Sequence, residues 1–187
     1  MNIALIKPPM TVSEYLAWGE VQNEHKHTQL INGRIVVMSP ESADHIRLKG
    51  RLYMALHAAI AAAGLSGCEA FTDGMTVPID LHTAYEPDAL VHCGAPVPSR
   101  QLVVPDPLIV AEVLSPSSAH MDTSAKLIGY FKLPSVMHYL VVDPDTRTLT
   151  HHQRQPDGSV AARTVTAGSL RLDPPGLELK LGELFGT

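Results

Sequence analysis

The pattern of apolar and polar residues predicts three amphipathic helices in this 187-residue chain. The longest covers residues 44–63, because its apolar side chains recur every three or four positions, and Gly64 ends it. Shorter helices are predicted over residues 11–19 and from the 117–118 serines to Leu133. The apolar stripe of the longest helix consists of Leu48, Leu52, Leu56, Ile60 and Ala63.

Short apolar runs between these helices predict strands. Asn32-Gly33 separates two such runs and is typical of a two-residue hairpin turn. Residues 108–114 are almost continuously apolar, as expected for a strand covered on both faces. The remaining predicted strands cover residues 70–73, 75–81, 88–93, 137–142, 148–154 and 160–165. This order predicts an α/β (α+β) fold in which helices flank a mixed central sheet, with an additional β-meander near the end.

Two acidic residues stand out against this pattern. Glu112 lies inside the apolar strand, where a carboxylate costs several kcal/mol unless it is paired or binds a metal. Alone, it fits a buried ion pair as well as a functional site. Asp88 begins another predicted strand directly after Pro87, and alone it would be an exposed turn residue. Two acids at the ends of adjacent strands together predict a site for a hard divalent cation.

The predicted helix after Glu112 carries Asp122, Lys126 and Tyr130 four residues apart, so these side chains share a face. We expect Lys126 to reach over the strand ends, although an exposed Asp122–Lys126 pair would be the default for an isolated helix. The opposite face, which we expect to pack on the sheet, consists of Ser124, Leu127, Ile128 and Phe131.

These segments resemble the Uma family of bacterial restriction endonucleases, which belongs to the PD-(D/E)XK nuclease superfamily. The resemblance extends from about Thr11 to His152, most of the chain. Its most specific part is the segment Glu-Val-Leu-Ser-Pro-Ser that follows Ala111. The matching segments are Glu-Pro-Asp at 86–88, Val-Ala-Glu-Val-Leu-Ser-Pro-Ser-Ser at 110–118, Asp122, Lys126, Tyr130, and Val-Val-Asp-Pro at 141–144.

The resemblance implies a single restriction-endonuclease-like domain over residues 1–187, with its core at about 11–152. It also implies Mg²⁺- or Mn²⁺-dependent hydrolysis of nucleic-acid phosphodiesters, most naturally in DNA. The expected metal ligands are Asp88, Glu112 and the backbone carbonyl of Val113, and Lys126 is the expected catalytic lysine. The expected supporting residues are Gln29, Asp122, Tyr130 and Ser115.

The chain departs from the family pattern at two positions. The superfamily lysine usually lies two residues after the second acid, where this chain has Leu114, so Lys126 on the following helix takes that role. Family members usually carry Glu before the Asn-Gly turn, where this chain has Gln29. This loss of an acid leaves open an inactive nuclease-fold module that binds nucleic acid or a protein partner. A hydrolase for another phosphoester also remains open, because a fold does not determine its substrate.

The composition adds constraints on partners and location. The net charge is −5, whereas nucleic-acid-binding proteins are usually basic, so binding requires a local basic patch. Cys68 and Cys93 are too few for a disulfide framework, which predicts buried free thiols. The histidines lack zinc-ligand spacing and are expected to be scattered on the surface; those at issue are His25, His27, His45, His151 and His152.

The first ten residues contain no long apolar run, and no segment has the roughly 20 apolar residues of a membrane helix. We therefore expect a cytoplasmic protein that does not bind membranes. Cleavage of both strands of a duplex requires two active sites, which favours a homodimer. Four C-terminal leucines must be covered, by a partner or by the chain's own sheet; they are Leu177, Leu179, Leu181 and Leu184.

Overall fold

The computed structural model describes residues 8–21, 27–115 and 123–186. A six-stranded sheet runs through the molecule in the order β10-β9-β8-β7-β6-β3. Only β7 and β8 pair in parallel among its described strands, so the sheet is mixed, as predicted. Its strands are β3 (Cys68–Thr72), β6 (Ala89–Cys93), β7 (Ile109–Val113), β8 (His138–Asp143), β9 (Thr148–Arg154) and β10 (Val160–Val165).

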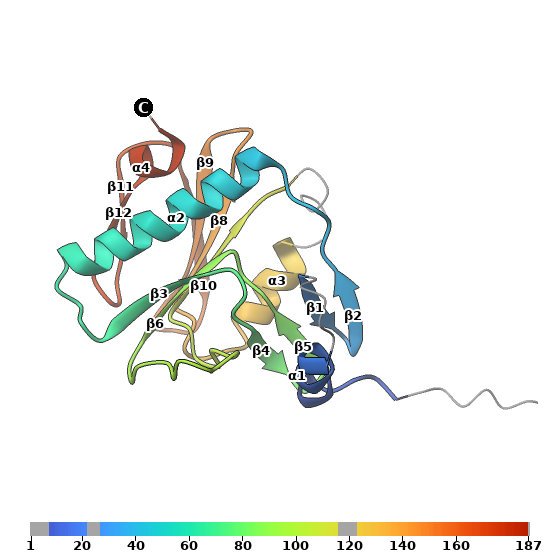
Figure 1. Cartoon of the computed structure of the whole chain (residues 1–187). Coiled ribbons are helices and arrows are strands. Elements are labelled where there is room, and N and C mark those ends of the chain that lie inside the picture. The colour runs from blue at the N-terminus through green and yellow to red at the C-terminus, as the bar shows by residue number, and fades with distance from the viewer. Residues whose placement is uncertain (1–7, 22–26, 116–122, 187) are drawn as a thin grey trace, which may run out of the picture.

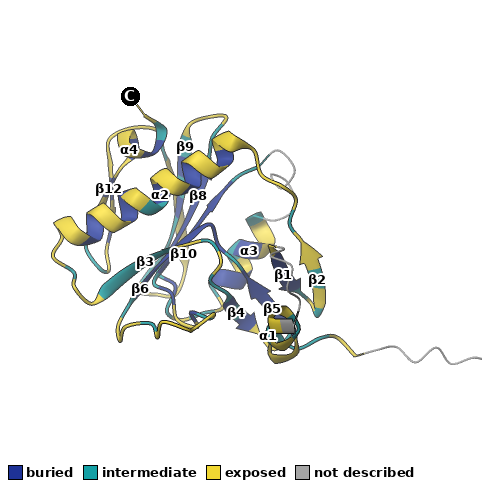
Figure 2. Cartoon of the chain, viewed as in Figure 1, coloured by how far each residue is buried: buried dark blue, intermediate teal, exposed yellow. Residues whose placement is uncertain are grey.

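Helices cover the two faces of this sheet (Figure 1). Helix α2 (Ala43–Ala62) lies across one face with its predicted leucine stripe buried and its other side exposed (Figure 2). Helix α3 (Thr123–Tyr130) packs against the other face. The alternation of side chains along the strands supplies both cores, since Ala111 packs under α2 and Val110 under α3.

A second sheet of order β2-β1-β5-β4 lies beside α3 (Figure 1). Its strands are β1 (Thr28–Ile31), β2 (Arg34–Val37), β4 (Val77–Asp80) and β5 (Thr83–Tyr85), and helix α1 (Val12–Val21) packs on it. The predicted hairpin turn is confirmed, because Asn32 and Gly33 have φ values of 50° and 74°. Positive φ at both central residues is what a type I′ turn requires.

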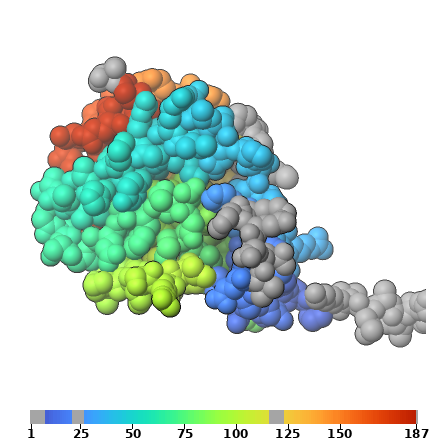
Figure 3. Space-filling view, viewed as in Figure 1, coloured from blue at the N-terminus to red at the C-terminus, as the bar shows by residue number. Residues whose placement is uncertain are grey.

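The C-terminal segment folds back onto the same core. It forms β11 (Ser169–Leu172), β12 (Leu177–Lys180) and α4 (Leu181–Phe185), and the last two contact α2. Figure 3 shows this segment in red beside α2. The four C-terminal leucines at positions 177, 179, 181 and 184 are buried in the α2 core. They are therefore covered by their own chain and give no support to a dimer interface.

The prediction of free thiols is wrong, because Cys68 and Cys93 form a disulfide. The two residues are register partners in the antiparallel pair of β3 and β6, with their Cα atoms 4.0 Å apart. They are 25 residues apart in sequence, and only the strand pairing brings them together. Among the described helices, none is long and apolar enough to cross a membrane.

Candidate active site

The antiparallel pairing of β6 and β7 brings the two predicted acids together. Ala89 pairs with Ala111, so Asp88 lies beside the end of β7. Its Oδ2 accepts a 2.6 Å hydrogen bond from the backbone N–H of Val113. The exposed fractions of Asp88 and Glu112 are only 9% and 8%, so both carboxylates are largely removed from bulk water.

Helix α3 supplies the partners of Glu112. Tyr130 Oη donates a 2.7 Å hydrogen bond to Glu112 Oε1, and Lys126 Nζ lies 3.0 Å from the same oxygen. Both donors are buried. The structure thus brings Lys126 and Tyr130 to the strand end occupied by Glu112, while Asp122 lies outside the described residues.

The predicted packing face of α3 is only partly correct, because Leu127 and Phe131 pack against the core while Ser124 and Ile128 do not. Ile128 is 66% exposed and Ser124 is exposed, whereas Lys126, Gly129 and Tyr130 are buried. The prediction assumed that the more apolar face would be covered. A buried carboxylate on the sheet requires hydrogen-bond donors, and this requirement determines how the short helix is oriented.

Gly129 allows α3 to approach the second sheet closely. A Cβ atom at this position would lie 2.6 Å from Cε2 of Tyr85, closer than packed atoms tolerate. The Tyr85 ring in turn packs edge-on against the Tyr130 ring, with 5.3 Å between centroids. The second sheet thereby holds the helix at the depth that places Tyr130 on Glu112.

Burial shifts the pKa values of Glu112 and Tyr130. Burial raises the pKa of Glu112 to about 7, with a further increase from Asp88, and Lys126 partly offsets both. Burial and the Glu112 charge raise the pKa of Tyr130 well above its usual value, so Tyr130 remains a hydrogen-bond donor. A carboxyl group with a pKa near neutrality is typical of functional sites, although structural ion pairs also produce such shifts.

A second cation, Lys49 of α2, lies on the other side of Asp88. Its Nζ is 3.1 Å from Asp88 Oδ1, 2.7 Å from Asp73 Oδ2 and 2.9 Å from Glu41 Oε1. Burial lowers the pKa of Lys49, but the adjacent carboxylates more than offset this and raise it overall, so Lys49 is charged. Sequence reasoning missed this group. The available signal was a lysine beside Leu48 and three residues before Leu52, at the border of the buried stripe.

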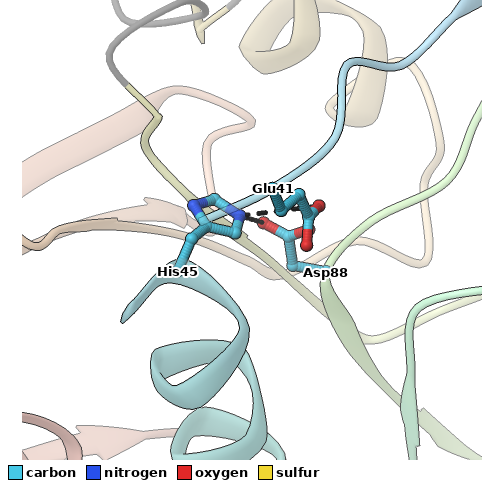
Figure 4. A group of neighbouring side chains, drawn as sticks. All are labelled: Glu41, His45 and Asp88. Atoms are coloured by element: carbon cyan, nitrogen blue, oxygen red, sulfur yellow. Dashed lines mark ion pairs between the residues drawn. The ribbon is translucent and has the colours of Figure 1, made fainter. Parts of the chain in front are cut away.

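His45 faces the same carboxylates from the first turn of α2 (Figure 4). Its Nε2 lies 3.7 Å from Glu41 Oε1 and 3.9 Å from Asp88 Oδ2. The donor atoms of these three residues all lie within 4.8 Å of one another, an arrangement that could hold a metal ion.

A pocket of about 410 Å³ opens over these groups. Its wall includes the expected supporting residue Ser115 and the expected ligand residue Val113. Gln29 is buried away from this wall and donates from Nε2 to the carbonyl of Glu86, at 3.3 Å. The polar and charged lining residues are Ser39, Glu41, Ser42, His45, Asp88, Glu112, Ser115, Thr123 and Lys126.

The histidines are not uniformly on the surface, as the sequence had suggested. His27 is exposed, but His45 and His151 are buried, and His151 pairs with His138 across β8 and β9. His25 lies outside the described residues. Burial of these histidines depends on tertiary packing, and sequence spacing carries no information on it.

Residues 12–182 match the Uma2 family, which is described as "Putative restriction endonuclease". The chain belongs to the Uma2 family. Two proteins of Synechocystis sp. (strain ATCC 27184 / PCC 6803 / Kazusa) are similar to this Uma2 chain. "Uncharacterized protein sll1609" is 30% identical over 79% of this chain and 82% of the relative. "Uncharacterized protein slr1290" is 29% identical over 81% and 77%, respectively.

The fold of this Uma2 chain is also that of a solved structure. A crystal structure from Anabaena variabilis ATCC 29413, described as "a putative nuclease belonging to DUF820", superposes with a TM-score of 0.74. The superposition covers 95% of this chain and 98% of the other, at 16% sequence identity. The fold is therefore restriction-endonuclease-like, as predicted, and family membership supports a nuclease-like function.

Proposed function

We propose that this Uma2 chain is a Mg²⁺- or Mn²⁺-dependent endonuclease that hydrolyses phosphodiester bonds in DNA. The observation that carries the proposal is the pair of buried carboxylates, Asp88 and Glu112, at the ends of adjacent strands beneath an open pocket. Lys126 lies against one of them. A protein gains no packing stability from burying like charges side by side, so the arrangement requires a chemical reason.

The residues fit a hard divalent cation. Carboxylate and carbonyl oxygens are the ligands that Mg²⁺ and Mn²⁺ prefer, and Asp88, Glu112 and the carbonyl of Val113 would supply them. When bound, such an ion polarises a phosphate oxygen and lowers the pKa of a coordinated water. Burial, with a smaller contribution from Asp88, raises the pKa of Glu112, and a bound cation would favour its charged form.

The chain's own groups account for the rest of the reaction. The oxygen of a water bonds to phosphorus while the phosphorus–oxygen bond to the leaving sugar breaks. The water loses one proton, and the leaving alkoxide gains one. Lys126, whose ammonium faces the pocket beside Glu112, orients the water and stabilises negative charge on the phosphate oxygens. Tyr130 positions Glu112 through its hydrogen bond.

Plasmid cleavage tests the proposal. We expect supercoiled DNA to be cut in Mn²⁺, with at least about 100-fold slower cutting by Glu112→Gln and by Lys126→Met. Lys132→Met, which removes an exposed ammonium paired with Asp80, is the matched control and should cut at the wild-type rate. Equal cutting by wild type and Glu112→Gln would refute the proposal. Binding of DNA without any cutting would support the inactive-module alternative.

The same assay addresses substrate and assembly. We propose a cytoplasmic homodimer, because one site cuts one strand and a twofold pair cuts both. A dimer predicts linear plasmid as an early product, whereas a monomer yields nicked circles first. A parallel incubation with single-stranded and duplex RNA distinguishes a deoxyribonuclease from a nuclease of broader range.

A further inference from the structure

His45 occupies a fixed position on the pocket wall. Ser42 caps α2, and its hydroxyl accepts a 3.2 Å hydrogen bond from the His45 backbone N–H. The His45 side chain is only 8% exposed, and its Nε2 faces the carboxylates of Glu41 and Asp88 (Figure 4). The helix start therefore fixes the backbone of His45, and its ring is buried facing these carboxylates.

Neither nitrogen of the His45 ring has a hydrogen-bond partner within the described part of the chain. Nδ1 is fully buried and unpartnered. Nε2 lies 3.7 Å and 3.9 Å from the two nearest carboxylate oxygens, beyond hydrogen-bonding distance. A buried imidazole that makes no hydrogen bond is uncommon and calls for an explanation.

The spacing fits ligands that share one ion. Nitrogen and oxygen ligands lie about 2.0–2.2 Å from a first-row divalent metal, so two ligands of the same ion are separated by about 3–4 Å. The distances from His45 Nε2 to Glu41 Oε1 and Asp88 Oδ2 fall in this range. They are too long for direct bonds and suitable for a bridging cation.

The local charge also fits a divalent ion. Lys49 Nζ contacts Asp88 through Oδ1, so Oδ2 is the oxygen on the His45 side. Three carboxylates, those of Glu41, Asp73 and Asp88, surround this single ammonium. Three negative charges and one positive charge leave two negative charges uncompensated among these four side chains. A dication neutralises them.

We propose that Glu41, His45 and Asp88 form a nitrogen-containing cation position, which makes the protein select Mn²⁺ and other transition-metal dications over Mg²⁺. Imidazole favours transition metals, whereas Mg²⁺ prefers oxygen ligands alone. This inference rests on the proposed function only because Asp88 belongs both to this position and to the proposed site with Glu112. It identifies His45 as a ligand and names the class of metal that the site takes.

Pulsed electron paramagnetic resonance of bound Mn²⁺ tests the ligand directly. We expect a ¹⁴N coupling in the wild-type protein that is lost in His45→Gln. The matched control, His57→Gln, changes an exposed histidine on the same helix and should keep the coupling. Because His45→Gln could disturb the helix start, wild-type protein labelled with ¹⁵N-histidine provides a second measurement, in which the coupling must change to that of ¹⁵N.

Metal titrations give the expected size of the effect. Loss of His45 should weaken Mn²⁺ binding by at least about tenfold and Mg²⁺ binding by much less. Bound Mn²⁺ without nitrogen coupling, or no bound Mn²⁺ at all, would overturn the inference. Glu112→Gln separates it from the proposed nuclease activity, since that variant should lose cleavage and keep the nitrogen coupling. A wild-type protein that shows the coupling and cuts no DNA would refute only the nuclease.

Discussion

Two buried polar groups of the central sheet are built in opposite ways. The acid–lysine site around Glu112 and Asp88 is charged and opens into a pocket. The His138–His151 pair lies on the α2 side, where His138 Nδ1 and His151 Nε2 are 2.8 Å apart. His138 Nε2 also lies 2.7 Å from the carbonyl of Pro174, which joins the pair to the segment between β11 and β12.

The hydrogen bonds of the histidine pair assign its protons. A carbonyl only accepts, so His138 Nε2 carries a hydrogen. Burial lowers the pKa of His138, and in its neutral form Nδ1 accepts from His151 Nε2. Burial also lowers the pKa of His151, to about 3, so both rings are neutral near pH 7. By contrast, burial raises the pKa of Glu112 to about 7 beside a charged lysine.

The difference shows which kind of buried polar group signals function. The histidine pair is neutral and ties two segments together, which a structural role explains. The acid–lysine site retains several charges of both signs at the edge of a pocket, and stability alone does not explain their burial.

Of the substitutions considered, removal of Lys49 should have the largest effect on stability, because Lys49 is the ammonium that three carboxylates of the acid–lysine site contact. Lys49→Met leaves Glu41, Asp73 and Asp88 without their ammonium. Breaking a buried ion pair costs about 3–5 kcal/mol, and the partial exposure of Glu41 and Asp73 favours the lower end, about 3 kcal/mol. Urea unfolding of metal-free protein measures this loss.

The control for this substitution is Lys132→Met. Lys132 and Asp80 form a 2.9 Å pair whose side chains are 53% and 41% exposed. An exposed pair contributes less than about 1 kcal/mol. A Lys49→Met protein as stable as this control would show that the acid–lysine site does not depend on its ammonium.

The sequence predicted the parts of both regions that depend on local pattern. Asn32-Gly33 requires positive φ, and the apolar run around Glu112 requires a covered strand, so the hairpin and the buried acid could both be predicted. The neighbourhood of Asp88 and Glu112 followed from adjacent strand ends, and strand pairing confirms that they lie side by side.

The contacts that the sequence did not predict depend on register or on helix rotation. Cys68 meets Cys93, and His138 meets His151, because of which strand residues pair. Lys49 lies at the border of an apolar stripe, where a small rotation of α2 would expose or bury it. Tertiary packing determines strand register and helix rotation, and neither leaves a periodic signal in the sequence.

The next largest effect on the free energy of unfolding should come from acidification, through the histidine pair. The pKa of His151 is about 3 in the folded protein and about 6.5 when unfolded, so only the unfolded chain takes up a proton between these values. The stabilisation is complete above pH 6.5 and is lost as pH falls. Between pH 7 and pH 5 the contribution of His151 alone falls by about 2 kcal/mol, opposite in sign to the contribution of Glu112, whose raised pKa stabilises the folded protein as pH falls.

His151→Gln sharpens this assignment, because glutamine can donate to His138 Nδ1 and does not titrate. We expect the unfolding free energy of the variant, relative to that of the wild type, to rise by about 2 kcal/mol as pH falls from 7 to 5, measured by urea titration at each pH. His57→Gln, at an exposed position on α2, should retain the wild-type slope. An unchanged slope in His151→Gln would mean that the pair does not titrate as the burial of its rings requires.

The smallest effect should come from Tyr130→Phe, which removes one hydrogen bond and no charge from the acid–lysine site. Glu112 Oε1 loses the 2.7 Å bond from Tyr130 and retains Lys126 at 3.0 Å, so no buried group is left unpaired. We expect a loss of about 1 kcal/mol in unfolding free energy, within the range for a single hydrogen bond. Because the Tyr130 bond lowers the pKa of Glu112, its loss should raise that pKa further and weaken Mn²⁺ binding several-fold near neutral pH.

Tyr53→Phe on α2 is the control and should change neither the unfolding free energy nor Mn²⁺ binding. If Tyr130→Phe weakened Mn²⁺ binding as much as Glu112→Gln, Tyr130 would be a ligand itself, and the distinction drawn here between the carboxylates and their hydrogen-bond donors would fail.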